Sequence, residues 1–272
     1  MTGSETQFGF PEFWPEFEGH FGPLFPALHG VEQALNGVVD RAYESVDGWQ
    51  RAVLNLGRLN GEAMEELIIL AANGCGPGAM KILRSILEYT VDAEYLRQNP
   101  AQFSNYSDWG DVERWRLYES LRSNAQTTYP AIGAQEIARA RQAYDSASQR
   151  FKGGGGSRRD RWCGLNLRDQ AVQAGLGSLY GQVNRLASQF LHGGMFGLVL
   201  RFEPKTDIHR IDVPPSAKWC REALSGGHYC LVQTVRTVAQ ALSAQPEPSV
   251  EELERQRRSA WDEITRRGSA PL

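Results

Sequence analysis

AMKILRSILEYTVDAEYLR, residues 79–97, is the segment with the strongest helical signal in the chain. Its apolar residues recur at intervals of three and four over most of a helix circumference, at Met80, Leu83, Ile86, Leu87, Val91, Tyr95 and Leu96. This spacing predicts a helix that is buried on most sides, at the centre of a larger bundle. Asn99-Pro100 ends the pattern, because proline cannot continue a helix ladder.

Helical spacing continues on both sides of this stretch. Residues 31–56 are expected to form one long amphipathic helix, and residues 61–72 a second one that ends at the glycine-rich cluster 73–78. Further helices are expected at 112–121, 137–151, 166–174, 178–191, 214–244 and 250–267. Because no strand pattern alternates with these helices, the sequence predicts an all-α multi-helix bundle.

Composition excludes several classes of protein. The chain has 272 residues and a formal net charge of −3, which argues against a strongly basic nucleic-acid coat and gives no DNA-specific signal. Its four cysteines form no C-x-x-C pair, and its longest apolar run, 67–72, is far shorter than the roughly 18 residues of a membrane span. We therefore expect a cytoplasmic protein without a membrane segment, a metal or another cofactor.

Three regions are distinguished along the chain. Residues 1–30 form an arm rich in phenylalanine and proline, residues 31–245 a helical domain with a flexible glycine-rich loop at 153–157, and residues 246–272 a charged helix and tail. The prolines are expected to exclude a regular helix from the arm, while its aromatic residues require burial. Packing on its own domain and contact with a partner both remain open for the arm. We expect a homodimer, because the arm is more apolar than a monomer surface normally is.

One polar constellation lies in the most apolar helix. Arg84 and Glu88 are four residues apart, so their side chains share one face and can form a buried ion pair. Tyr95 lies on the same stripe and is expected to extend this polar line. Such a pair either locks a helix in place or forms the wall of a functional site.

A second constellation lies in the helix expected at 178–191 and just after it. Tyr180, Arg185, Ser188 and His192 follow one another there, with Ser188 and His192 one helical turn apart. A histidine transfers protons near neutral pH and an arginine stabilises phosphate charge, so this set suits phosphodiester chemistry. The alternative is a packed histidine with no catalytic role.

Basic residues surround the glycine-rich loop. Arg158, Arg159 and Arg161 are the candidates for substrate contact in this patch. The glycine-rich loop at 153–157 can be either a solvated loop or a phosphate-binding loop, although it lacks the Gly-Lys-Ser/Thr ending of a P-loop.

The order of these motifs resembles that of a bacterial family known as domain of unknown function 5677, over about residues 30–240. The motifs that carry the resemblance are Arg84-Ser-Ile-Leu-Glu88, Tyr95-Leu96, Trp162, Tyr180 and Ser188-x-x-x-His192-Gly193. That family is in turn similar to the HEPN helical bundles, several of which are metal-independent ribonucleases with an Arg-x4-6-His motif, often built across a dimer. Arg185 and His192 fit the looser form of this motif, but Leu186 stands where those enzymes carry a polar residue.

Two functions of different classes remain open, of which the resemblance implies the first. The first is a HEPN-like, metal-independent ribonuclease or RNA-binding protein of the bacterial defence or stress type, with Arg185 and His192 as catalytic residues. Arg84, Glu88, Tyr95, Tyr180 and Ser188 would support this site. The second is a non-catalytic helical interaction module in a regulatory or defence assembly, in which the same polar residues lock helices together.

Overall fold

The computed structural model describes residues 9–42, 46–123, 133–151, 161–191 and 217–267. These residues form helices and turns, and no strand, which confirms the all-α prediction. The α-helices are α1 (Trp14–Phe21), α2 (Leu24–Ala42), α3 (Gly48–Ala72), α4 (Gly76–Gln98), α5 (Phe103–Ser123), α6 (Ala134–Ala147), α7 (Leu167–Gln173), α8 (Gly177–Leu191), α10 (Cys220–Ala241) and α11 (Val250–Arg267). No described helix is long and apolar enough to cross a membrane.

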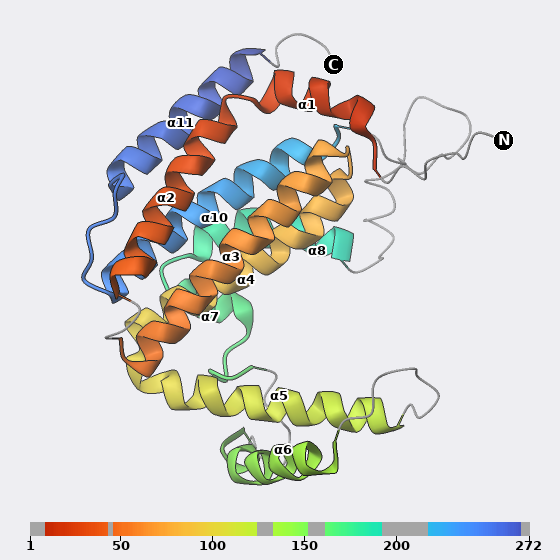
Figure 1. Cartoon of the computed structure of the whole chain (residues 1–272), viewed down its shortest axis with the longest axis vertical. Coiled ribbons are helices and arrows are strands. Elements are labelled where there is room, and N and C mark those ends of the chain that lie inside the picture. The colour runs from red at the N-terminus through yellow and green to blue at the C-terminus, as the bar shows by residue number, and fades with distance from the viewer. Residues whose placement is uncertain (1–8, 43–45, 124–132, 152–160, 192–216, 268–272) are drawn as a thin grey trace, which may run out of the picture.

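The centre of the molecule is a packed set of three helices, α3, α4 and α10 (Figure 1). As residues 79–97 predicted, α4 is buried on most of its circumference. One polar cluster joins the three helices in the core: Asn60 donates hydrogen bonds to Thr90 at 3.1 Å and Thr234 at 2.8 Å. Because buried polar groups are costly unless paired, this cluster fixes the relative register of the three helices.

The prediction that proline excludes helices from residues 1–30 was wrong. Within the described part, residues 11–30 form a short 3-10 helix, all of α1 and the start of α2. The four prolines fall in the first turns of these helices or, for Pro23, in the turn between α1 and α2. First-turn N–H groups have no partner within the helix, so proline is tolerated there. Phe17, Phe21, Leu24 and Leu28 join the main core, so this segment packs on its own chain.

The expected boundaries between residues 31 and 72 also need correction. The chain forms two helices where one was expected over 31–56, since α2 ends at Ala42 and α3 begins at Gly48. The side chain of Gln50 accepts a hydrogen bond from the Asp47 backbone N–H at 2.9 Å and so caps the start of α3. Helix α3 then continues through Gly61, because one glycine inside a helix costs only about 1 kcal/mol.

The remaining helices surround this centre. Helices α7 and α8 pack against α4, while α11 lies over α2 and α10. Helices α5 and α6 pair as a hairpin beside the bundle, with a small core of their own around Val112, Ala147 and Phe151 (Figure 1). The packing of α8 on α4 is what brings the two polar constellations into contact.

Candidate functional site

The two polar constellations meet at the contact between α4 and α8. Arg84 on α4 donates a hydrogen bond from Nε to Glu88 Oε1 at 2.7 Å, and from Nη1 to Ser188 Oγ on α8 at 3.2 Å. The Arg84 side chain is only 17% exposed and that of Glu88 35% exposed. A charge-assisted hydrogen bond in a half-buried place holds α8 against α4 more firmly than apolar contact alone.

The contact continues along α8. Ser188 Oγ donates to Asn184 Oδ1 at 3.1 Å, and Asn184 Nδ2 donates to Tyr180 Oη at 2.8 Å. Tyr180, Asn184 and Ser188 are four residues apart, so they form one row on the helix face that meets Arg84. The predicted supporting residues Tyr180 and Ser188 therefore lie in the same network as Arg84 and Glu88.

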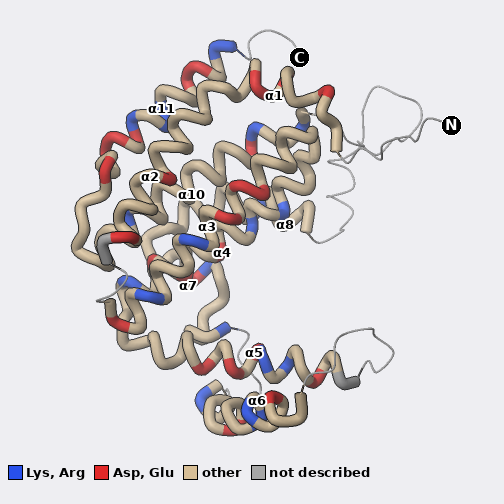
Figure 2. The backbone as a smooth tube through the Cα atoms, in the orientation of Figure 1, with Lys and Arg blue, Asp and Glu red and all other residues tan. Residues whose placement is uncertain are grey.

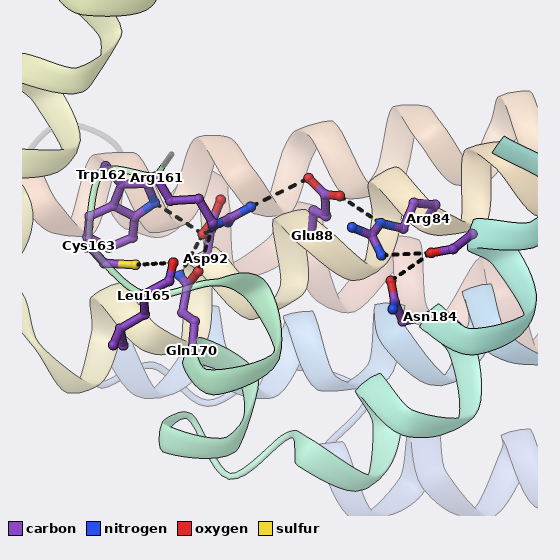
Figure 3. A network of polar contacts seen from close by, with 10 residues as sticks. Arg84, Glu88, Asp92, Arg161, Trp162, Cys163, Leu165, Gln170 and Asn184 are labelled. Atoms are coloured by element: carbon purple, nitrogen blue, oxygen red, sulfur yellow. Dashed lines mark hydrogen bonds and ion pairs between the residues drawn. The ribbon is translucent and has the colours of Figure 1, made fainter. Parts of the chain in front are cut away.

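The network also extends along α4 toward α7 (Figure 3). Glu88 Oε2 lies 3.8 Å from Arg161 Nη1, and Arg161 Nη2 donates to Asp92 Oδ1 at 2.7 Å. The same Asp92 oxygen accepts hydrogen bonds from Gln170 Nε2 at 2.6 Å and Trp162 Nε1 at 3.1 Å. These contacts form one continuous network, which we call the α4 network; its members are Arg84, Glu88, Asp92, Arg161, Trp162, Gln170, Tyr180, Asn184 and Ser188.

Asp92 is the most deeply buried acid of the α4 network. Burial raises the pKa of its carboxyl above the usual value, although Arg161 and the three donors act in the opposite direction. The carboxylate is thus balanced between the cost of losing water and the gain from its partners. Removal of any one partner would upset this balance.

Arg161 and Tyr95 do not have the surroundings that the sequence predicted. Arg161, proposed to contact substrate, is 19% exposed and pairs with Asp92 and Glu88, because these carboxylates lie within its reach on α4. Tyr95 does not extend the polar line; it is buried against the Trp162 ring, with the ring centroids 5.6 Å apart. Among the described residues the Tyr95 hydroxyl has no hydrogen-bond partner.

Arg185 lies on a different side of α8 from the row at Ser188. Its side chain is exposed and makes no ion pair or hydrogen bond with another described residue. It lines an open hollow of about 590 Å³ together with Gly181, Gln182, Leu186 and Gln189. The other proposed catalytic residue, His192, lies outside the described residues, as do Arg158, Arg159 and the loop at 153–157.

The hollow at Arg185 adjoins a second one of about 500 Å³ between α8 and α10. Gln182 and Leu186 line both hollows, so the two hollows are neighbours on α8. The second hollow adds two guanidinium groups, one carboxylate and one aromatic ring, from Arg221, Arg257, Glu222 and Tyr229. The Arg257 guanidinium lies over the Tyr229 ring, 5.0 Å from its centroid.

The described residues contain no group of three or more histidine, cysteine, aspartate or glutamate side chains that could hold a metal ion. The α4 network and its surroundings present guanidinium, carboxylate, amide and hydroxyl groups. Guanidinium groups bind and orient anions, and carboxylates can transfer protons.

Comparison with family models assigns the chain. Residues 55–209 match a model described as Family of unknown function (DUF5677). The chain belongs to this family. The match includes α4, α7 and α8, and therefore every member of the α4 network, but not α10 or α11. No curated protein and no solved structure matches the chain, so the HEPN likeness of this DUF5677 member rests on the sequence motif alone.

Three members of the α4 network, Asp92, Asn184 and Gln170, were missed in the sequence. Asp92 follows Glu88 by four residues, as Glu88 follows Arg84, so the repeat Arg84, Glu88, Asp92 already indicated a charged row on one face of α4. Gln170 gave no such signal, because its partners lie on α4 and in the loop before α7. Only the fold brings it to Asp92.

Proposed function

We propose that this DUF5677 member binds single-stranded RNA along α8 and cleaves it without a metal. Arg185 would contact a phosphate, and His192 would transfer the proton during cleavage. The observation that supports the proposal is that Arg185 is an exposed cation without a described partner, on a helix that the α4 network holds in place. Arg185 shares this exposure with Arg51, Arg58, Arg139 and Arg168, none of which has an ion pair with another described residue. Its place on α8, close to Ser188 and His192 in the sequence, distinguishes Arg185 from them.

The surroundings of Arg185 suit a chain of nucleotides. The neighbouring hollow is lined by two further guanidinium groups, Arg221 and Arg257, of which Arg257 pairs with Glu254 at 3.1 Å. Tyr229 adds an aromatic ring, of the kind on which RNA bases stack. Arg221 donates to the Thr265 hydroxyl at 2.7 Å and has no described carboxylate partner, so its charge remains available.

Ser188 and Arg84 would act as positioning residues in this proposal. Ser188 lies one turn before His192 in the sequence, and its bond to Arg84 fixes the end of α8 against α4. A catalytic pair must be held within a fraction of an ångström of its working geometry, which a buried hydrogen-bond network achieves.

RNA binding is tested by fluorescence anisotropy with a labelled single-stranded RNA. We expect Arg185→Ala to weaken binding about fivefold or more and to lower the dependence of log affinity on log salt by about one. Arg168→Ala is the matched control, because Arg168 on α7 is also exposed and without a described partner. Equal loss in the two variants, or no binding by the wild type, would contradict the proposal.

A second candidate is a non-catalytic helical module in a regulatory assembly. It is favoured by the pairing inside the α4 network, where Arg84, Glu88, Asp92 and Arg161 all have charged partners from the same chain. In this reading the family motifs preserve the packing of α8 on α4. It predicts that Ser188→Ala and Arg84→Ala lower the melting temperature while no RNA is cleaved by the parent protein.

A further inference from the structure

A groove lies between α2 and α3, on the far side of α3 from the α4 network. It has a volume of about 430 Å³. Its apolar lining comes from three helices: Phe25, Leu28, Val31 and Leu35 of α2, Met64 and Ile68 of α3, and Leu231 of α10. Phe25 leaves 38% of its surface exposed there, although large apolar side chains are normally covered.

The groove has the length of a helix-binding site. Phe25 and Leu35 are ten residues apart on α2, which at 1.5 Å per residue corresponds to about 15 Å, or nearly three helical turns. Two helices that flank an apolar floor form the kind of groove into which the apolar stripe of a third helix packs. We therefore consider an amphipathic helix as the occupant.

The rim of the groove is acidic. Of the described residues that line it, Glu32, Glu62 and Glu65 are acidic and only Arg58 is a formal cation. Glu62 and Glu65 are exposed and form no ion pair with another described residue, and Figure 2 shows acidic positions along this part of α3. Glu32 has only His29 beside it, at 3.5 Å. Unpaired carboxylates around an apolar floor favour a partner with cations beside its apolar stripe.

We infer that the groove between α2 and α3 is a docking site for a basic amphipathic helix of a partner protein. The partner would place leucine-like side chains on Phe25, Leu35 and Ile68, and lysine or arginine side chains toward Glu62 and Glu65. This site lies apart from Arg185, so it does not depend on the RNA proposal.

Gly61 gives a way to close the groove without disturbing the fold. A Cβ atom added there would meet only Leu35 Cδ2, at 4.0 Å, so a larger side chain has room to enter the groove. Gly61→Leu also replaces a glycine in the middle of α3, which should raise the melting temperature because leucine favours a helix. A variant that stabilises the protein but blocks the groove separates docking from folding.

The probe is a fluorescein-labelled synthetic peptide of about 18 residues, five helical turns, with leucine at the i, i+3, i+4 and i+7 positions and lysine beside them. Its controls are a scrambled peptide of the same composition and the same stripe with glutamate in place of lysine. Binding is measured by anisotropy on the full chain. We expect the leucine–lysine peptide to bind at least about tenfold more tightly than either control.

Neighbouring residues on α3 supply matched variants. Glu65 and Ile68 line the groove, whereas Glu66 and Ile69 are exposed on the same helix but do not. We expect Glu65→Lys and Ile68→Ala to weaken peptide binding about threefold or more, and Glu66→Lys and Ile69→Ala to change it less than about twofold. Gly61→Leu should weaken it about tenfold.

Three results would overturn the inference. One is a Gly61→Leu protein that binds the peptide as the wild type does. Another is equal binding of the glutamate peptide. The third is light scattering that shows a dimer for the wild type and a monomer for Gly61→Leu. The groove would then be occupied by a second copy of this chain.

Discussion

Replacement of Asp92 by alanine should be the most destabilising single change in the α4 network. One oxygen of Asp92 accepts hydrogen bonds from Arg161, Trp162 and Gln170, at 2.6–3.1 Å. Asp92→Ala removes the acceptor for all three donors at once. It also leaves the Arg161 guanidinium, only 19% exposed, with Glu88 at 3.8 Å as its nearest carboxylate.

The expected loss follows from these contacts. Breaking a buried ion pair by removing one partner costs about 3–5 kcal/mol. For a chain of this size 1 kcal/mol corresponds to about 2–4 °C, so the melting temperature should fall by roughly 6–20 °C. Asp108→Ala is the control, because Asp108 pairs with Arg150 at 2.7 Å on the surface, where a pair contributes only about 0–1 kcal/mol.

The assay is thermal and urea unfolding followed by circular dichroism at 222 nm, on the wild type, Asp92→Ala, Asp92→Asn and Asp108→Ala. Asp92→Asn keeps an acceptor oxygen for Trp162 and Gln170 and should lie between the wild type and Asp92→Ala. Because burial raises the pKa of Asp92, the stability of the wild type relative to Asp92→Asn should be greatest at low pH. That difference should shrink as the pH rises through the raised pKa. If Asp92→Ala and Asp108→Ala lose the same free energy of unfolding, the buried Asp92 contacts stabilise the protein no more than the surface pair at Asp108 does.

Two further predictions concern the packing of α10 and α4. Both ring nitrogens of buried His228 lack a hydrogen-bond partner among the described residues, and burial lowers the pKa of this histidine to about 3. His228→Leu should therefore leave the protein as stable at pH 7 or stabilise it by about 1 kcal/mol. Below the ordinary pKa of histidine the unfolded chain binds a proton that the folded protein does not bind. Between pH 7 and pH 4 the free energy of unfolding, measured with urea, should therefore fall by about 3 kcal/mol more for the wild type than for His228→Leu. Equal falls would contradict this prediction. A Cβ atom at Gly76 would lie 1.9 Å from the Lys218 carbonyl oxygen, so Gly76→Ala should cost about 2 kcal/mol or more in the same assay. Gly110→Ala, with no atom within 4 Å, should cost nothing, and similar losses in both variants would show that the close approach is not rigid.

The sequence predicted correctly those helices for which the apolar spacing and the residues at the helix ends indicate the same boundaries. Helix α4 has both, and so does α11, expected over 250–267 and found there. Residues 11–30 were misjudged because proline was read as a general helix breaker, whereas its effect depends on position within the turn. The separation of α2 from α3 depends on a cap at Asp47, which apolar spacing alone does not reveal.

The candidate site was predictable only where its residues are close in sequence. The Arg84–Glu88 pair follows from spacing on one helix, and both residues were expected to support the same site as Ser188, to which Arg84 is hydrogen-bonded. The roles of Arg161 and Gln170 could not be predicted, because their partners lie 69 and 78 residues away on α4. Arg161 looked like part of a basic surface until the fold placed Asp92 beside it.

Cleavage of a labelled single-stranded RNA by the full chain in excess chelator tests the proposed function most directly. If the protein is a ribonuclease, we expect the wild type to cleave the RNA. The cleavage rate should fall about 10²-fold or more for His192→Ala and for Arg185→Ala. Arg168→Ala should keep the wild-type rate, and all three variants the wild-type melting temperature. RNA that stays intact for hours with the wild type, together with a strongly destabilised His192→Ala, would contradict the ribonuclease account and favour the non-catalytic module.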